Sequence, residues 1–332
     1  MNVLLFALSS CQLLQHALVF AQVTFDTTMA ATTRAAGQCQ CYPGGTCPSG
    51  TGGIDVRIVN QGTLSCPSGY VLCCNTGGGI NDASCGVRKI APSPHPVGQA
   101  AYGAYPWQVA LLTSNNGYIG GGVLITPTHV LTVAHKVYNV TAIKARLGAW
   151  DLQSTTEGHV DIAVSRITVH PDFNKPVYLA NDIAVLKLSS AAPIATNNNV
   201  NTVCVPSSAI AAGTKCEVAG WGKDAFATGQ YQNILKQVDV SVVSLADCQT
   251  ALRKTRLSGF FNLDSSFMCA GGEAGKDACT GDGGSALVCS VNGGAYQAVG
   301  LVAWGIGCAD SGVPGVYVDV SRFFPWITQQ LT

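Results

Sequence analysis

The stretch Cys279-Thr-Gly-Asp-Gly-Gly-Ser-Ala-Leu-Val-Cys289 decides how the rest of this chain is interpreted. Glycines at 281, 283 and 284 beside Asp282 predict a tight turn, because glycine adopts backbone conformations that other residues avoid. The apolar run Ala286-Leu287-Val288 then predicts a buried strand. The stretch is therefore a turn that leads into a strand, with a cysteine at each end.

Short apolar segments separated by turn residues continue on both sides of this stretch, from Tyr105 to Thr332. Many short strands with frequent turns are typical of an all-β barrel or sandwich. Near the end, the run from Phe323 to Ile327 predicts a short helix, with Pro325 suited to its first turn. Residues 105–332 are therefore expected to form one all-β domain.

Several segments of this region resemble, in the same order, segments of the trypsin-like serine proteases. Motifs that recur together in one order are a far more specific signal than any one of them alone. The resemblance covers about two-thirds of the chain and implies the chymotrypsin fold of two β-barrels. Besides 279–289, the matching segments are Leu131-Thr132-Val133-Ala134-His135, Asn181-Asp182-Ile183-Ala184-Val185-Leu186, Ala219-Gly220-Trp221-Gly222 and Pro314-Gly315-Val316-Tyr317.

The resemblance also implies which residues form the catalytic site, and one of them has changed. His135 matches the general base and Asp182 the acid that orients it, but Gly283 stands where the family has its attacking serine. Acyl transfer needs an oxygen within hydrogen-bond reach of the histidine, and glycine has none. Ala303 replaces a serine that usually bonds the aspartate. We therefore expect a protease fold that does not cleave peptides, with His135 and Asp182 kept for packing and hydrogen bonding.

Ser285 is the alternative nucleophile, two residues beyond Gly283. The family has a second glycine at this position, and the backbone there already turns toward the following strand. A catalytically active trypsin-like endopeptidase that uses Ser285 is therefore the rival interpretation. Labelling of Ser285 by a fluorophosphonate probe would establish it.

A second defect is expected in the activation of the domain. In active members a new amino terminus pairs with the aspartate that here is Asp282, and this orders the loop that binds the oxyanion. Residues 94–99 read Pro-His-Pro-Val-Gly-Gln, with no basic residue and no usable start. Cleavage after Lys89 would expose Ile90, but this new amino terminus lies too far along the chain from the position that would insert beside Asp282. We expect Asp282 to contact either another partner or solvent, and the Gly281 amide not to be set for an oxyanion.

The specificity pocket is expected to be whole. Asp277 matches the floor residue that pairs with arginine or lysine in trypsin-like members, and Gly305 and Gly315 match the glycines of open walls. Such a pocket would bind a guanidinium through charge-assisted hydrogen bonds. A vestigial, partly collapsed pocket is the alternative, and benzamidine titration would decide between the two.

The composition of the 332 residues is that of a globular protein with a buried core. Hydrophobic residues make up 47% of the chain, charged residues only 11%, and the formal net charge is zero. Such a balance argues against an electrostatic nucleic-acid or membrane partner. Residues 1–21 predict a secretory signal peptide; a membrane anchor is the alternative, but Gln12, Gln15 and His16 interrupt it. Residues 22–38 predict a flexible lead-in.

Fifteen cysteines, less Cys11 in the predicted signal, leave fourteen, an even number that predicts a disulfide framework in a secreted chain. Ligand spacings typical of zinc sites are absent. Cysteines 39, 41, 47, 66, 73 and 74 fall within a segment rich in glycine and proline. Residues 39–75 are thus expected to be a small stapled domain, since so short a unit cannot build an adequate apolar core. Residues 76–104 predict a linker.

The spacing of these cysteines resembles the clip domain that precedes arthropod immune proteases. The two resemblances together imply the disulfide pairing, which spacing alone leaves open. The family's bridge beside the catalytic histidine is missing, with Gly120 and Lys136 at its two positions, so a looser histidine loop is expected. The implied pairs are Cys39–Cys73, Cys41–Cys66, Cys47–Cys74, Cys85–Cys204, Cys216–Cys289, Cys248–Cys269 and Cys279–Cys308.

Three further sites are suggested by local sequence. Arg57-Ile58 is either a bond for activating cleavage, as the resemblance to non-catalytic clip proteins implies, or part of a plain strand at 54–59. Asn139-Val140-Thr141 is an N-glycosylation sequon. Asp151, Glu157 and Asp161 lie in the loop that binds calcium in some members of the resembling family. Ala149 and Val160 occupy two of the usual ligand positions, so solvated loop acids are favoured over a calcium site, and no other metal or cofactor is expected.

The resemblance finally implies a function: a secreted, non-catalytic cofactor or regulator of the arthropod melanisation cascade, working in haemolymph. Its expected partners are prophenoloxidase and an upstream activating clip-domain protease, with self-assembly after cleavage. Besides the active endopeptidase, the rival is an adhesion or pattern-recognition protein that binds microbial surfaces. The sequence leaves open whether the chain promotes or restrains the cascade.

Overall fold

The computed structural model describes the backbone of residues 39–43, 52–53 and 70–74, and the complete residues 79–223, 228–276, 278, 281–290, 293–308 and 310–331. Strands β1 (Cys39–Pro43), β2 (Gly52–Gly53) and β3 (Tyr70–Cys74) pair antiparallel in the order β1-β3-β2. They lie within the predicted clip domain. The signal peptide, the lead-in, Arg57, Ile58 and the side chains of the six clip cysteines lie outside the described residues.

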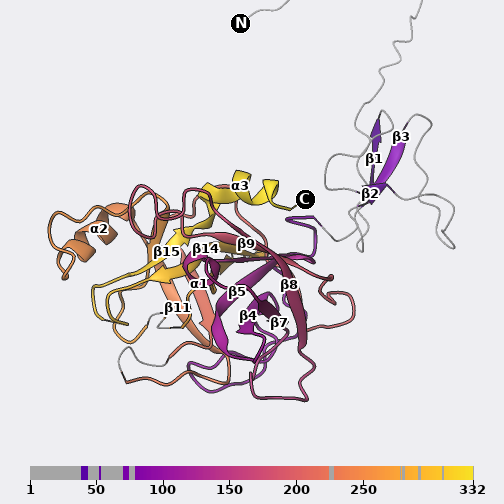
Figure 1. Ribbon diagram of the computed structural model, residues 1–332, viewed down its shortest axis with the longest axis horizontal. Helices are drawn as coiled ribbons and strands as arrows, with labels where there is room; N and C mark the ends of the chain where they lie inside the picture. The colour runs from indigo at the N-terminus through magenta and orange to yellow at the C-terminus, as the bar shows by residue number, and fades with distance from the viewer. Residues whose placement is uncertain are drawn as a thin grey trace, which may run out of the picture. The chain divides into compact units, whose positions relative to one another are not determined.

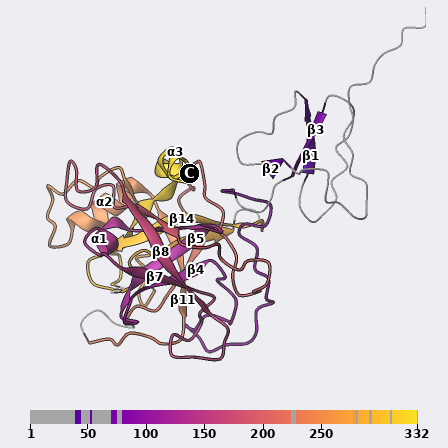
Figure 2. The same ribbon diagram turned by 45° about the vertical axis from the view of Figure 1, so that its right-hand side comes forward.

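The first barrel closes six antiparallel strands in the order β4-β5-β6-β9-β8-β7. In Figure 1 and Figure 2 its strands run from purple to dark pink. The alternating burial of β7 shows one side chain in two pointing into the barrel, as a half-exposed strand requires. Its strands are β4 (Gln108–Thr113), β5 (Tyr118–Thr126), β6 (His129–Thr132), β7 (Ile143–Leu147), β8 (Val160–Val169) and β9 (Ala184–Leu188).

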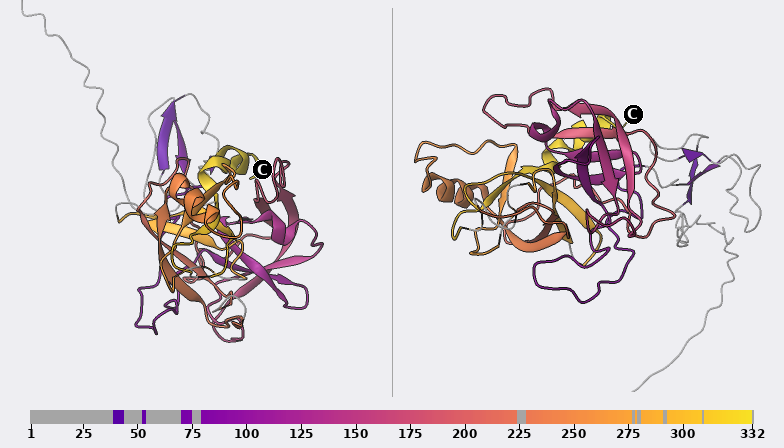
Figure 3. Two further views of the ribbon diagram at one scale, coloured as in Figure 1. Left: turned by 90° about the vertical axis from the view of Figure 1, so that its left-hand side faces the viewer. Right: turned by 60° about the horizontal axis from the view of Figure 1, so that its bottom comes forward.

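The second barrel closes another six strands in the order β10-β11-β12-β15-β14-β13. The two barrels lie side by side, as Figure 3 shows. The predicted two-barrel fold is therefore confirmed. The strands are β10 (Lys215–Gly220), β11 (Lys236–Val243), β12 (Phe267–Ala270), β13 (Ala286–Ser290), β14 (Tyr296–Trp304) and β15 (Gly315–Asp319).

A hydrophobic core joins the two barrels, and each barrel also has an interior core of its own. Strand β4 serves both kinds of core, because Val109 and Leu111 fill the first barrel while Ala110 and Leu112 belong to the joint core. A strand covered on both faces reads as a continuous apolar run. Trp107 and Trp221, both fully buried, fill the joint core from opposite barrels.

Three short α-helices accompany the barrels. Helix α1 (Ala134–Val137) follows β6 and carries His135. In α2 (Leu245–Arg253), the Ser244 hydroxyl caps the first turn by accepting from the Asp247 amide, and the Cys248–Cys269 disulfide ties the helix to β12. The predicted C-terminal helix is present as η2 (Val320–Phe323) and α3 (Phe324–Gln329), with Pro325 in its first turn. None of the helices among the described residues combines the length and apolar character that a bilayer crossing needs.

Part of the predicted linker is bonded to the barrels. The Cys85–Cys204 disulfide holds it, and the Asn201 side-chain amide donates to the carbonyls of Ser84 and Val87. The Arg88 guanidinium lies 4.3 Å from the ring centroid of Tyr296, with a 2.6 Å ion pair to Glu217. Residues 79–90 therefore form a docked arm, which glycine and proline content alone would not predict.

Candidate functional site

His135 and Asp182 meet at the boundary of the barrels. Asp182 is fully buried, and its two carboxylate oxygens accept hydrogen bonds from the His135 backbone amide at 2.8 Å and from His135 Nδ1 at 2.6 Å. A carboxylate can only accept, so the ring proton lies on Nδ1 and the Nε2 atom faces the cleft. The structure thus brings together the expected base and acid. Ala303, which also lines the cleft, has only a methyl group and adds no hydrogen bond to Asp182.

Gly283 lies directly opposite the imidazole. A β-carbon at this position would be 3.5 Å from His135 Nε2, so a serine here would face the base. The loop is held by its backbone, since the Gly283 carbonyl accepts from the Gly121 amide at 2.9 Å and the Gly284 amide donates to the Val302 carbonyl at 2.9 Å. The position of the nucleophile is therefore preserved, while the nucleophile itself is missing.

Ser285 points away from the cleft. Its side chain is fully buried, and its hydroxyl oxygen accepts a 2.9 Å hydrogen bond from the side-chain amide of Gln108, in β4 of the other barrel. A β-carbon on Gly121 would come within 2.1 Å of that hydroxyl oxygen, so glycine is needed there. The expectation that Ser285 is no substitute nucleophile agrees with this placement, because its oxygen is part of the joint core rather than of the pocket beside His135.

Asp282 is buried behind the same loop. Its Oδ1 atom accepts from the Gly222 amide at 2.8 Å, and β-carbons on Gly220 or Gly222 would come within 2.1 and 2.6 Å of it. This explains both glycines of the Ala219–Gly222 motif, a reason that the sequence did not reveal. The Tyr118 phenol lies close by, and its pKa is raised first by burial and then by the Asp282 carboxylate.

The segment upstream of the domain follows a different path from an inserted amino terminus. The Gly98 carbonyl accepts from the Gln237 amide at 3.0 Å, and Val97 is fully exposed. Lys89 is also held, because its ammonium donates to the carbonyls of Ile194 at 2.5 Å and Val200 at 2.8 Å. Cleavage after Lys89 would require this side chain to leave both carbonyls first.

Lys136 and Gly120 lie in contact where the family's histidine-loop bridge would be. A β-carbon on Gly120 would be 3.4 Å from Lys136 Cγ, so the lysine stem packs over the glycine. Lys136 Cε would be 2.8 Å from a β-carbon on Gly283, which places the ammonium end beside the missing nucleophile. Burial lowers the pKa of Lys136, and the Asp182 and Asp282 carboxylates oppose that shift.

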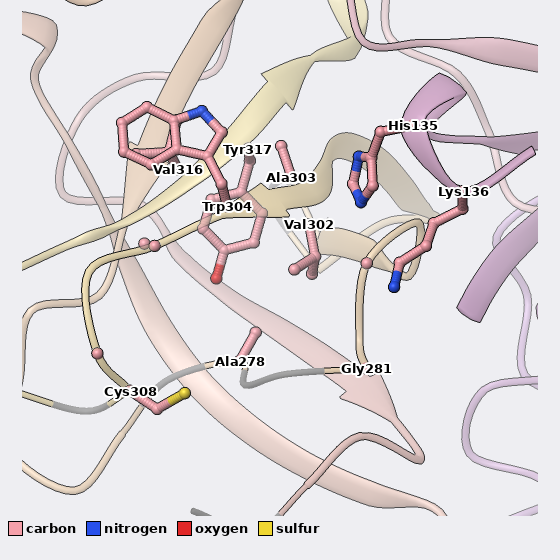
Figure 4. Close-up of a pocket in the computed structure, with 14 residues that line it drawn as sticks. His135, Lys136, Ala278, Gly281, Val302, Ala303, Trp304, Cys308, Val316 and Tyr317 are labelled. Atoms are coloured by element: carbon pink, nitrogen blue, oxygen red, sulfur yellow. The ribbon is translucent and has the colours of Figure 1, made fainter. Parts of the chain in front are cut away.

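A pocket of about 200 Å³ opens beside these residues (Figure 4). Gly305 and Gly315 are among its walls, as the resemblance implies, and His135 and Lys136 lie at its edge. A β-carbon on Gly305 would meet nothing closer than 3.6 Å, so this wall is open. Asp277, the expected floor residue, lies outside the described residues.

Three disulfides are seen among the described residues: Cys85–Cys204, Cys216–Cys289 and Cys248–Cys269. All three are pairs that the resemblance implies. Cys308 is also disulfide-bonded, and its expected partner Cys279 lies outside the described residues.

The remaining predicted sites among the described residues are the glycosylation sequon and the loop considered for calcium. Asn139 is exposed in the turn after α1. In the loop considered for calcium, the Glu157 carboxylate accepts from the Trp150 and Asp151 amides. Asp161 pairs with Arg146 at 2.7 Å and Lys144 at 2.8 Å. Within the described part of the chain, no three potential metal-ligating side chains gather.

Comparison with known proteins agrees with this geometry. The family model described as Trypsin matches residues 97–327. The chain is 47% identical over 323 residues to the inactive CLIP domain-containing serine protease A3 of Aedes aegypti, covering 89% of this chain and 67% of that protein. It is 45% identical over 270 residues to phenoloxidase-activating factor 2 of Galleria mellonella, covering 76% and 87%. It is also 38% identical over 229 residues to trypsin I-P1 of Gallus gallus, covering 68% and 84%. The chain therefore belongs to the trypsin family, as a clip-domain serine protease homologue.

Proposed function

We propose that this protein is a secreted serine protease homologue that is inactive because of Gly283, and that it acts as a cofactor or regulator in an arthropod protease cascade that produces phenoloxidase. The observation that carries the proposal is Gly283 opposite His135, with a β-carbon position only 3.5 Å from Nε2. Without a hydroxyl there is no proton for the imidazole to take and no oxygen to form an acyl-enzyme.

What remains is a stable recognition surface. The His135–Asp182 hydrogen bond and the two closed barrels hold the residues around a pocket of about 200 Å³, and this supports a role in binding. Binding to a partner needs this surface but no nucleophile. The similar proteins include inactive CLIP-domain serine proteases and a phenoloxidase-activating factor. These names support a role within a protease cascade rather than in digestion.

Activation is expected to require a cut after Arg57 by an upstream clip-domain protease, with prophenoloxidase as the downstream partner. N-terminal sequencing of the processed protein should find a new terminus at Ile58. The docked arm, held by the Cys85–Cys204 disulfide, is separate from that bond and would stay attached after such a cut.

Reconstitution tests the function. Prophenoloxidase and its activating protease are combined with the intact chain, with the chain cut at Arg57, or with an uncuttable Arg57→Gln variant, and phenoloxidase activity is measured. We expect the cut chain alone to change the yield of active phenoloxidase. If the cut chain changes nothing in either direction, the proposed role is wrong.

A parallel measurement tests the missing activity. Purified, processed protein is incubated with an arginyl amide substrate and with a fluorophosphonate probe. We expect neither turnover nor labelling. Labelling that maps to Ser285 would show that the chain is an enzyme after all, despite the burial of that hydroxyl.

A further inference from the structure

Lys136 places a cation at the edge of the pocket beside His135. It is half-buried, its stem packs over Gly120, and its ammonium end lies beside Gly283 at the edge of the pocket (Figure 4). Among the described residues, its ammonium has no hydrogen bond or ion pair, only the more distant attraction of Asp182 and Asp282. A partly desolvated charge without a direct partner is costly, and a ligand anion would relieve that cost.

Both nearby carboxylates accept hydrogen bonds from other groups of the fold. Both oxygens of Asp182 are bonded to His135, and Asp182 is fully buried behind the imidazole. Asp282 is 9% exposed and bonds the Gly222 amide behind the loop. Among the described residues that line the pocket, Lys136 and His135 are the two with a basic side chain, and the Tyr317 phenol also lies there.

We propose that this vacated nucleophile position binds the free C-terminal carboxylate of a peptide, with Lys136 as its anchor. The carboxylate lies in the cleft beside Gly283, in front of the lysine ammonium, where it accepts a charge-assisted hydrogen bond from the lysine. The last side chain of the peptide enters the adjoining pocket. This inference rests on the proposed function in one respect, namely that the cleft binds peptides without cutting them.

The size of the pocket and the position of the charge together select this ligand. Drug-sized ligands fill pockets of about 300–1,000 Å³, whereas this pocket has about 200 Å³, which suits a single side chain. A residue inside a peptide would place a neutral amide in front of Lys136, and a terminal residue places a carboxylate there. Ends of this kind are released whenever a trypsin-like protease cuts after arginine or lysine.

Peptide pairs that differ only in their last group provide the test. The full chain is titrated calorimetrically with short acetylated peptides that end in arginine, lysine or leucine, each as the free acid and as the amide. We expect at least one acid to bind, about tenfold or more tightly than its amide. Lys136→Met should abolish the difference between acid and amide, while Lys254→Met, a change at an exposed lysine after α2, should preserve it.

Three outcomes would overturn the inference: equal binding of acid and amide by the wild-type chain, no binding of any peptide at millimolar concentration, or an acid preference that survives in Lys136→Met. Lys136→Gln serves as a second variant, and the thermal midpoint of each variant shows that it is folded. A chain that fails here but still changes phenoloxidase yield in reconstitution loses this inference and keeps its proposed function.

Discussion

The two sides of the cleft differ in what their residues contact. On the first barrel, Asp182 is fully buried and both its oxygens accept hydrogen bonds from His135, so this contact ties His135 to the interior of the fold. On the second barrel, Gly283 contributes only backbone to the core and its missing side chain would have pointed into the cleft. Groups that stabilise the fold can therefore persist in a homologue that has lost catalysis, whereas a hydroxyl facing the cleft contributes to chemistry alone.

The largest effect is expected for the glycine beside Gly283. Gly284 has a φ of +91°, and a β-carbon there would lie 2.3 Å from both the Gly121 carbonyl oxygen and the Thr132 hydroxyl. Gly284→Ala should lower the free energy of unfolding by about 3 kcal/mol or more, through overpacking and the unfavourable backbone conformation. Urea unfolding measures the change.

Gly283→Ala is the matched control for that variant. Its β-carbon would displace only the flexible end of Lys136, and the expected loss of unfolding free energy is below about 1 kcal/mol. Equal losses for the two glycines would contradict the distinction between the cleft-facing and core-facing parts of the loop.

The next largest effect is expected for the His135–Asp182 pair. Asp182→Ala leaves the His135 amide and Nδ1 without their acceptor, and each unsatisfied donor costs about 1–3 kcal/mol. We expect a loss of about 2–3 kcal/mol in urea unfolding, against little change for Asp172→Ala, whose residue is exposed. If Asp182→Ala unfolds with the same free energy as the wild-type chain, the His135–Asp182 pair does not stabilise the fold.

A smaller effect is expected at an ionic contact far from the core. Hydrogen bonds from Arg146 lower the pKa of Asp161 to about 2, with Lys144 contributing. Since the folded pKa is below the unfolded value of about 3.9, the contact stabilises the fold above that pH and is lost as pH falls toward about 2. Solvent screening limits the contribution to below about 1 kcal/mol.

The variant Asp161→Asn isolates this contact. Its deficit in unfolding free energy, measured against the wild-type chain, should be present near neutral pH and should disappear on acidification toward about pH 2. A deficit that grows on acidification would show the opposite sign and contradict the assignment.

The smallest effect is expected for restoring the nucleophile. Gly283→Ser should give little or no hydrolysis of an arginyl amide, because the segment at Val97–Gly98 lies against β11 rather than at Asp282, and Lys136 crowds the new side chain. The wild-type chain is the negative control of this assay, and active trypsin is the positive control. Robust turnover by this variant would show that the missing amino terminus does not limit the site.

Much of the fold could be predicted from the sequence. Apolar segments of strand length, punctuated by turn residues, are local features, and the ordered motifs of the resemblance placed both barrels. Pro325 similarly marked the first turn of the C-terminal helix. The resemblance implied one attachment of the docked arm, Cys85–Cys204. The contacts of Arg88 with Glu217 and Tyr296 could not be predicted, because these residues lie more than a hundred positions away.

The sequence by itself determined that the catalytic hydroxyl is missing, because Gly283 has no side-chain oxygen in any conformation. Only the tertiary structure decided what the neighbouring side chains do. It buried Ser285 against Gln108, 177 positions away, and it turned Lys136 toward the vacated position. The physical reason is that the atoms of a residue depend on its type alone. Its burial and its charged neighbours depend on side chains that only the closed barrels bring together.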